Sequence, residues 1–84
     1  MSFTVRILPR AEKQLTWLDA TPYETIKKKM YSLRENPRPP GCRKLMDQPG
    51  WRVRAGDYRI VYEIDDVSRI VTILRVGHRK EIYR

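Results

Sequence analysis

The chain opens with a segment in which polar and apolar residues alternate. This period of two over residues 2–8 predicts a β-strand. Behind it, apolar residues recur at the three- and four-residue spacing of one helix face, and Pro9 stands where a first helical position would be. The apolar positions of this stripe are Ala11, Leu15 and Leu18. We therefore predict a helix that begins at Pro9 and ends near residues 19–20.

A second helix is predicted by a start signal, a stripe and a stop signal. Thr21, Pro22 and Glu24 have the spacing of a capping box, with Thr21 as the N-cap. The apolar positions that follow are Ile26, Met30 and Leu33. The pair at residues 36–37, Asn-Pro, ends the pattern. Two helices joined by so short a link form an α-hairpin.

The second half of the chain has the pattern of an antiparallel sheet. The predicted strands cover residues 44–47, 51–55, 58–64 and 69–76. Gly56 and Asp57 predict a tight hairpin turn, and Asp65 and Asp66 predict a second turn. Residues 78–84 are predicted to be a short tail after the last strand.

This order of elements predicts an α+β fold. An N-terminal strand and an α-hairpin pack on a small, mainly antiparallel sheet. The chain has 84 residues, a length suited to one domain, so we expect residues 1–84 to form a single domain.

Apolar runs and cysteine content indicate the environment. No apolar run approaches the roughly 18 residues of a membrane span, and Arg6 interrupts the apolar N-terminal segment. Cys42 is the single cysteine and no histidine or cysteine cluster accompanies it. We expect a cytoplasmic protein that binds no membrane, no metal and no cofactor.

Positive charge is concentrated in three segments. The net charge is +8. Residues 26–42 carry +4, residues 43–62 carry +3 and residues 75–84 carry +3, whereas residues 1–25 balance to zero and residues 63–74 carry −2. Such clustering is typical of a surface that binds a polyanion. The alternative is a basic surface that serves only solubility.

Three arginines on neighbouring strands are the first candidates for chemistry. Arg52 and Arg54 are two residues apart and share a face of their strand, and Arg59 follows the tight turn. The planar guanidinium fork matches phosphate oxygens. The pairing register of the strands decides whether Arg59 lies on the same face as Arg52 and Arg54. The alternative interpretation is that these arginines point outward only because this face of the sheet is exposed to solvent.

The C-terminal segment adds a histidine and a tyrosine. His78 is the single histidine and the side chain suited to proton exchange near neutral pH, and Tyr83 could stack on a base. An exposed histidine in a basic tail is the alternative reading. The sequence lacks a glycine-rich phosphate loop and a plausible serine–histidine–aspartate set.

Two motifs carry a resemblance to a known family. Residues 57–62 (DYRIVY) and residues 77–83 (GHRKEIY) resemble the central strands and the C-terminal end of the RelE/ParE toxin superfamily. The likeness extends over essentially the whole chain. It implies two helices against a small sheet and a cognate antitoxin, RelB-like or similar. For the RelE branch it also implies an endoribonuclease that cleaves mRNA on the translating ribosome by metal-free attack of the ribose 2′-OH.

The resemblance also implies roles for individual residues. Arg52 and Arg54 occupy the places of a base and a charge stabiliser, Arg59 that of the arginine at the scissile phosphate, and Tyr83 that of a tyrosine that orients the substrate. Arg79 takes the place of an arginine that stabilises phosphate or protonates the leaving group. RelE has lysines where this chain has Arg52 and Arg54, and arginine loses a proton too reluctantly to serve readily as a base. The resulting catalytic prediction comprises Arg52, Arg54, Arg59, His78, Arg79 and Tyr83, with His78 the candidate base.

Ribosome and RNA binding is expected to be spread over other cations. These are Lys27, Lys28, Lys29, Arg43 and Lys44. Two alternative functions stay open. A ParE-like inhibitor of DNA gyrase would share the fold without nuclease activity, and a non-catalytic RNA-binding module would use basic strands with stacking aromatics. Tyr58 and Tyr62 share a face with Ile60 and Ile64, which favours a place in the core over a stacking platform.

Overall fold

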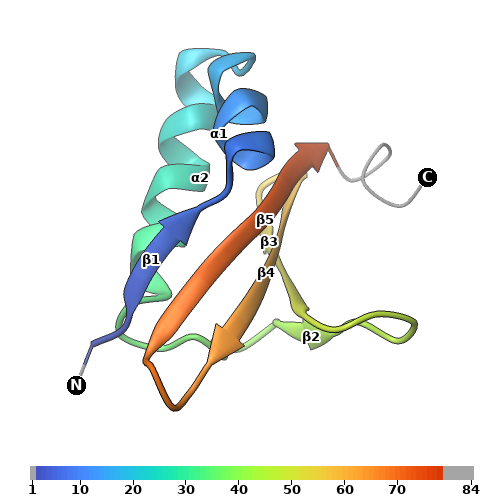
Figure 1. Cartoon of the computed structure of the whole chain (residues 1–84). Coiled ribbons are helices and arrows are strands. Elements are labelled where there is room, and N and C mark those ends of the chain that lie inside the picture. Colours follow the sequence, from blue (N-terminus) through green and yellow to red (C-terminus); the bar gives the residue numbers. More distant parts are fainter. Residues whose placement is uncertain (1, 79–84) are drawn as a thin grey trace.

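The computed structural model describes residues 2–78, which form two helices and a five-stranded sheet (Figure 1). The elements in chain order are β1 (Thr4–Ile7), α1 (Pro9–Thr16), α2 (Ala20–Ser32), β2 (Arg43–Lys44), β3 (Trp51–Ala55), β4 (Tyr58–Asp65) and β5 (Ile70–His78). The strands lie in the order β1-β5-β4-β3-β2. β1 pairs with β5 in parallel and the other pairs are antiparallel. The predicted α+β fold is confirmed.

Both helices cover the same face of the sheet and leave the other face open (Figure 1). The core between the layers draws on alternate residues of the strands and on the apolar stripes of the helices. It includes Ala11, Leu15, Ile26, Met30, Leu33, Val53, Ile60, Tyr62, Val71, Ile73 and Val76. No charged residue is among the buried residues of segment 2–78. The charges are therefore available on the helix surface and on the open sheet face.

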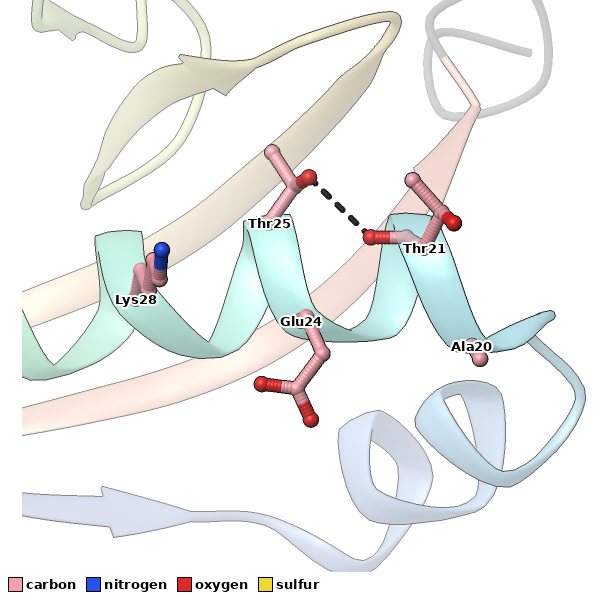
Figure 2. A pocket seen from close by; sticks show the side chains of 5 residues that line it. All are labelled: Ala20, Thr21, Glu24, Thr25 and Lys28. Atoms are coloured by element: carbon pink, nitrogen blue, oxygen red, sulfur yellow. Dashed lines mark hydrogen bonds between the residues drawn. The ribbon is translucent and has the colours of Figure 1, made fainter.

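The predicted start of the second helix is wrong by two residues. Asp19 is the N-cap and makes no side-chain capping bond, so Thr21 lies inside α2 and the capping box does not form. The Thr25 hydroxyl instead donates to the Thr21 carbonyl oxygen at 3.0 Å (Figure 2). Pro22 tolerates this shift because backbone N–H groups of the first turn have no intrahelical acceptor to lose.

The ends of the strands also differ from the sequence prediction. β2 covers two residues at 43–44, and a bond from the Leu45 N–H to the Gly50 carbonyl oxygen (3.0 Å) closes the loop behind it. β5 continues past Gly77, because His78 pairs with Tyr58 of β4. The prediction that residue 78 begins a tail is therefore wrong, and its side chain takes the direction that the strand imposes.

The turn between β4 and β5 is longer than the predicted pair of residues. The Asp65 carboxylate accepts the N–H groups of Val67 (3.1 Å) and Ser68 (3.0 Å) and so organises the turn. Arg69 closes it with a φ of 57°. In addition, the β4–β5 register shifts between Val61 and Tyr62, which is a β-bulge that the periodicity does not predict.

Candidate functional site

Four arginines gather on the open face of the sheet because of the strand register. Arg43 of β2 lies opposite Arg52 of β3, and Arg54 of β3 lies directly opposite Arg59 of β4. Directly opposed residues of antiparallel strands share a face. Val53, between Arg52 and Arg54, points into the core and is 2% exposed, so the arginines face away from the helices.

These four arginines surround a hollow of about 300 Å³, which we call the arginine cradle. Gly41 and Val53 complete its lining, and none of these lining residues is acidic. Arg54 and Arg59 form a like-charged cross-strand pair, which destabilises a sheet unless an anion lies between them. The cradle thus has the charge and the donor chemistry of a phosphate site.

Arg59 supplies the strongest indication of an anion. Its side chain is half-buried, and its Nη1 atom is buried without a hydrogen-bond partner in the described part of the chain. A buried donor that lacks an acceptor costs about 1–3 kcal/mol, and more when it is charged. A bound phosphate oxygen would accept that hydrogen bond and also offset the repulsion from Arg54.

Arg54 is oriented by the turn that separates β3 from β4. Its Nε–H donates to the Gly56 carbonyl oxygen at 2.9 Å. Gly56 has a φ of 62°, a conformation that glycine adopts without strain, so the hairpin stays tight. The bond fixes the Nε end of the guanidinium of Arg54, which lines the cradle.

The open face continues toward β5 through the bulge. Val61 is outside the main core cluster, yet it is only 1% exposed. Its cross-strand neighbours are Arg52 and Arg75, and long side chains of this kind cover apolar surface with their aliphatic stems. Arg75 therefore extends the basic face. The sequence reasoning missed it, because the bulge decides its side of the sheet.

His78 does not join the arginine cradle. Its neighbour two residues earlier, Val76, is buried in the core, so both side chains project from the helix-covered side of β5. The imidazole packs edge-on against the ring of Tyr58, with centroids 5.5 Å apart and an interplanar angle of 77°. The other two predicted residues of this segment, Arg79 and Tyr83, lie outside the described residues.

The cations expected to bind the ribosome separate into two groups. Arg43 belongs to the cradle, whereas Lys44 lies opposite Trp51, whose ring packs against the core side of the sheet. The three lysines at 27–29 belong to α2, on the layer that covers the other sheet face. Lys28 borders a shallow hollow on α2 together with Ala20, Thr21, Glu24 and Thr25 (Figure 2).

Two further features bear on the class of site. Across residues 2–78 no three histidine, cysteine, aspartate or glutamate side chains are grouped so that they could hold a metal ion. Neither helix of that segment is long and apolar enough to cross a membrane.

Comparison with known proteins establishes the family. The family model described as the ParE toxin of the type II toxin–antitoxin system parDE matches residues 5–83. Fold and sequence thus define a small toxin of the RelE/ParE superfamily. The chain belongs to this family of type II toxins, and the resemblance inferred from the sequence motifs is confirmed.

Individual relatives point to the RelE branch. The mRNA interferase toxin RelE of Escherichia coli is 30% identical over 99% of this chain and 92% of its own length. Toxin RelG of Mycobacterium tuberculosis is 58% identical over 31 residues, which is 37% of this chain and 36% of RelG. A chain in the crystal structure of the Mycobacterium tuberculosis toxin–antitoxin complex RelBE2 is 29% identical, with a TM-score of 0.84 over 94% of this chain and all of that chain.

Proposed function

We propose that this toxin is an endoribonuclease that cleaves mRNA on the translating ribosome. The observation that carries the proposal is the buried Nη1 atom of Arg59, which lacks a partner within the described structure and belongs to a cradle lined by three further arginines. The mRNA interferase name of the Escherichia coli relative supports the same activity. A gyrase inhibitor of the ParE type has no evident need for four converging guanidinium groups.

The proposed reaction is a transesterification at one phosphodiester. The ribose 2′-oxygen forms a bond to phosphorus, the bond from phosphorus to the 5′-oxygen of the next nucleotide breaks, and one proton moves from the 2′-OH to a base. A second proton reaches the departing 5′-oxygen, which leaves a cyclic phosphate and a 5′-OH end. Negative charge builds on the phosphate oxygens in between, and preorganised cations act most strongly on that charge.

The arginine cradle fits the stabilising part of this reaction. We assign Arg59 to the scissile phosphate, since it lines the cradle and its buried Nη1 atom has no acceptor among residues 2–78. Arg54 lies opposite it on β3 and Arg52 two residues earlier on the same strand, in the places of a base and a charge stabiliser. As arginines, both are proposed here to stabilise charge. By the family resemblance, Arg79 adds phosphate stabilisation or leaving-group protonation, and Tyr83 orients the substrate.

His78 stays the predicted general base. This role requires its imidazole to leave Tyr58, against which it packs, and to turn toward the arginine side of the sheet. With His78 as base, its imidazole accepts the proton of the 2′-OH. His78→Gln removes that acceptor and is expected to lower the single-turnover cleavage rate.

Tyr58→Phe is the matched control for this measurement, because it keeps the ring that contacts His78 while changing the neighbouring hydroxyl. An unchanged single-turnover rate in His78→Gln would remove His78 from the mechanism. The proton would then have to pass to Tyr83, to a substrate phosphate or to ribosomal RNA.

We further propose that a cognate antitoxin covers the basic open face. The RelBE2 complex of Mycobacterium tuberculosis is a precedent for such an assembly. The net charge of +8 and the exposed cations of the cradle favour a partner segment with acidic residues, because opposite surface potentials steer association.

Expression of the chain alone in a bacterium is therefore expected to arrest growth, and coexpression with its antitoxin to restore growth and yield. Arg59→Ala is the control, because it removes the proposed activity and leaves most of the basic surface. Normal growth and yield of the native chain alone would contradict the proposal.

The decisive test of the function is incubation with translating ribosomes. Defined breaks in the mRNA, mapped at their ends, support the endoribonuclease. Trapped gyrase–DNA complexes with intact mRNA would assign the chain to gyrase inhibition instead.

A further inference from the structure

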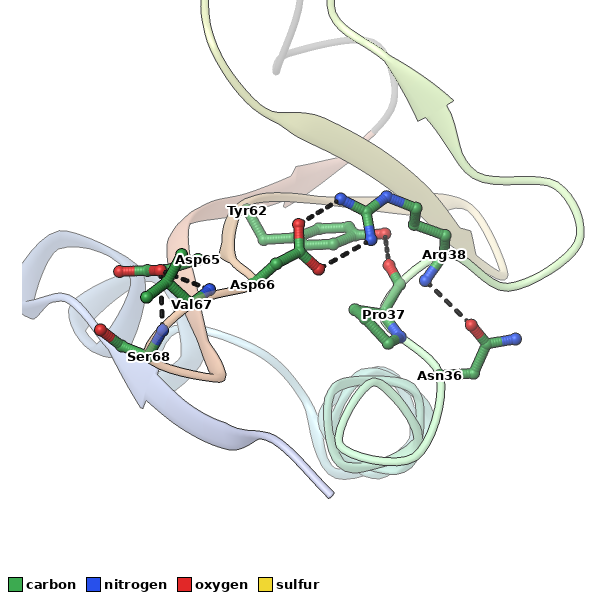
Figure 3. A network of polar contacts seen from close by, with 8 residues as sticks. All are labelled: Asn36, Pro37, Arg38, Tyr62, Asp65, Asp66, Val67 and Ser68. Carbon is green, nitrogen blue, oxygen red and sulfur yellow. Dashed lines mark hydrogen bonds and ion pairs between the residues drawn. The ribbon is translucent and has the colours of Figure 1, made fainter. Parts of the chain in front are cut away.

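The loop that follows α2 is tied to β4 and to the β4–β5 turn. The buried Tyr62 hydroxyl donates to the Pro37 carbonyl oxygen at 2.7 Å. Arg38 donates from Nη1 and Nη2 to the two carboxylate oxygens of Asp66, at 3.1 and 2.9 Å, and its N–H donates to the Asn36 side-chain oxygen at 3.1 Å (Figure 3). Residues far apart in the sequence are thus joined within one network.

Arg38 also lies over Trp51, the first residue of β3. Its guanidinium carbon is 5.2 Å from the ring centroid, so the guanidinium contacts the ring as well as Asp66. We call Arg38, Asp66 and Trp51 the clamp. An exposed ion pair alone contributes little, but a two-pronged pair held against an aromatic face has a defined geometry. Asp66 favours the charged form of Arg38, and Arg38 in turn lowers the pKa of the Asp66 carboxyl.

A stiff connection leads from the clamp to the arginine cradle. Pro39 and Pro40 directly follow Arg38 and restrict the backbone, and the Cys42 N–H donates to the Pro39 carbonyl oxygen at 3.0 Å. The next residues in line, Gly41 and Arg43, line the cradle. The two prolines and this bond thus restrict the backbone between Arg38 and the cradle.

β2 by itself is a weak anchor for Arg43. It has two residues, both exposed, that pair with Arg52 and Trp51 of β3. Strands this short contribute little pairing energy, so the preceding loop has to hold Arg43 in place. From these contacts we infer that Arg38 is a positioning residue, which through the clamp holds Gly41 and Arg43 at the arginine cradle and so raises its affinity for RNA phosphate. This inference rests on the proposed function of the cradle.

The test measures whether Arg38 acts through Arg43. The probe is a 2′-O-methyl RNA trinucleotide, which carries phosphates but no 2′-OH for the reaction. Its Kd is measured by NMR titration of the native chain, Arg38→Ala, Arg43→Ala and the double variant. We expect Arg38→Ala to weaken trinucleotide binding by about fivefold, which corresponds to the upper end of the energies that exposed ion pairs contribute. Because the effect passes through Arg43, the same change should add nothing in the Arg43→Ala background.

Two further variants sharpen the result. Asp66→Asn alters the other partner of the ion pair, at an exposed residue of the β4–β5 turn. It should weaken trinucleotide binding as Arg38→Ala does, and it provides the test if Arg38→Ala does not fold. Arg34→Ala is the matched control, because Arg34 is an exposed arginine that lies 5.1 Å from the ring centroid of Tyr31 and makes none of the clamp contacts. It should leave the Kd unchanged.

The outcomes separate this inference from the proposed function. If Arg38→Ala weakened trinucleotide binding equally in the native chain and in Arg43→Ala, the effect would be a general one on folding or charge. That result would overturn the inference. Absence of trinucleotide binding by the native chain would overturn it as well. Coupled binding together with intact mRNA on ribosomes would remove the endoribonuclease and leave the clamp. Cleavage of mRNA on ribosomes without coupling between Arg38 and Arg43 would support the endoribonuclease and overturn the inference about the clamp.

Discussion

Arg59→Ala is expected to lower the single-turnover rate of mRNA cleavage on ribosomes by about 10²-fold or more, the usual loss when a preorganised charge stabiliser is removed. The physical reason is that Arg59 lines the cradle with a charged guanidinium, whose buried Nη1 atom has no acceptor among residues 2–78. When an interaction is stronger in the transition state than in the bound substrate, its loss lowers the reaction rate more than it weakens substrate binding.

Two controls make this measurement specific. Arg59→Lys keeps the charge but loses the planar fork, so it should recover only part of the rate. Arg10→Ala removes an exposed arginine at the start of α1, on the helix side of the sheet, and should leave the rate unchanged. The affinity for the ribosome should change little in all three variants, since other cations of the chain contribute to ribosome binding. Weaker binding with an intact rate in Arg59→Ala would refute the assignment.

Tyr62→Phe is expected to destabilise the fold by about 1–3 kcal/mol at neutral pH, because it leaves the Pro37 carbonyl oxygen buried without its hydrogen-bond donor. Tyr62 is completely buried and its hydroxyl makes this bond at 2.7 Å. Urea unfolding monitored by circular dichroism measures the difference. Tyr31→Phe, at a partly exposed ring on α2, is the matched control and should cost far less.

The same residue gives the protein a specific alkaline sensitivity. Burial raises the pKa of the Tyr62 hydroxyl far above its usual value of about 10. The unfolded state therefore loses this proton first as the pH rises. The Tyr62 contribution is fully present below pH of about 10 and is lost above it, by up to about 1.4 kcal/mol per pH unit. The difference between native and Tyr62→Phe should narrow above that pH, and parallel stability curves would contradict this account.

The residue pattern by itself determined the elements and part of the site. Period-two alternation and helical stripes reflect which residues an element buries, so they located both helices and the main strands. The same alternation placed Arg52 and Arg54 on one face. Local signals were less reliable at the element ends. The capping box at Thr21 did not form, because Asp19 occupies the N-cap position.

Tertiary structure decided which separate segments meet. The β3–β4 register set Arg59 opposite Arg54, and the pairing of β2 brought Arg43 beside Arg52. The continuation of β5 directed His78 toward Tyr58, away from those arginines. These placements depend on the pairing of one strand with another, on a bulge and on the final residues of a strand. A shift of one residue in register moves a side chain to the opposite face of the sheet, and the period of a single strand contains no information about that shift.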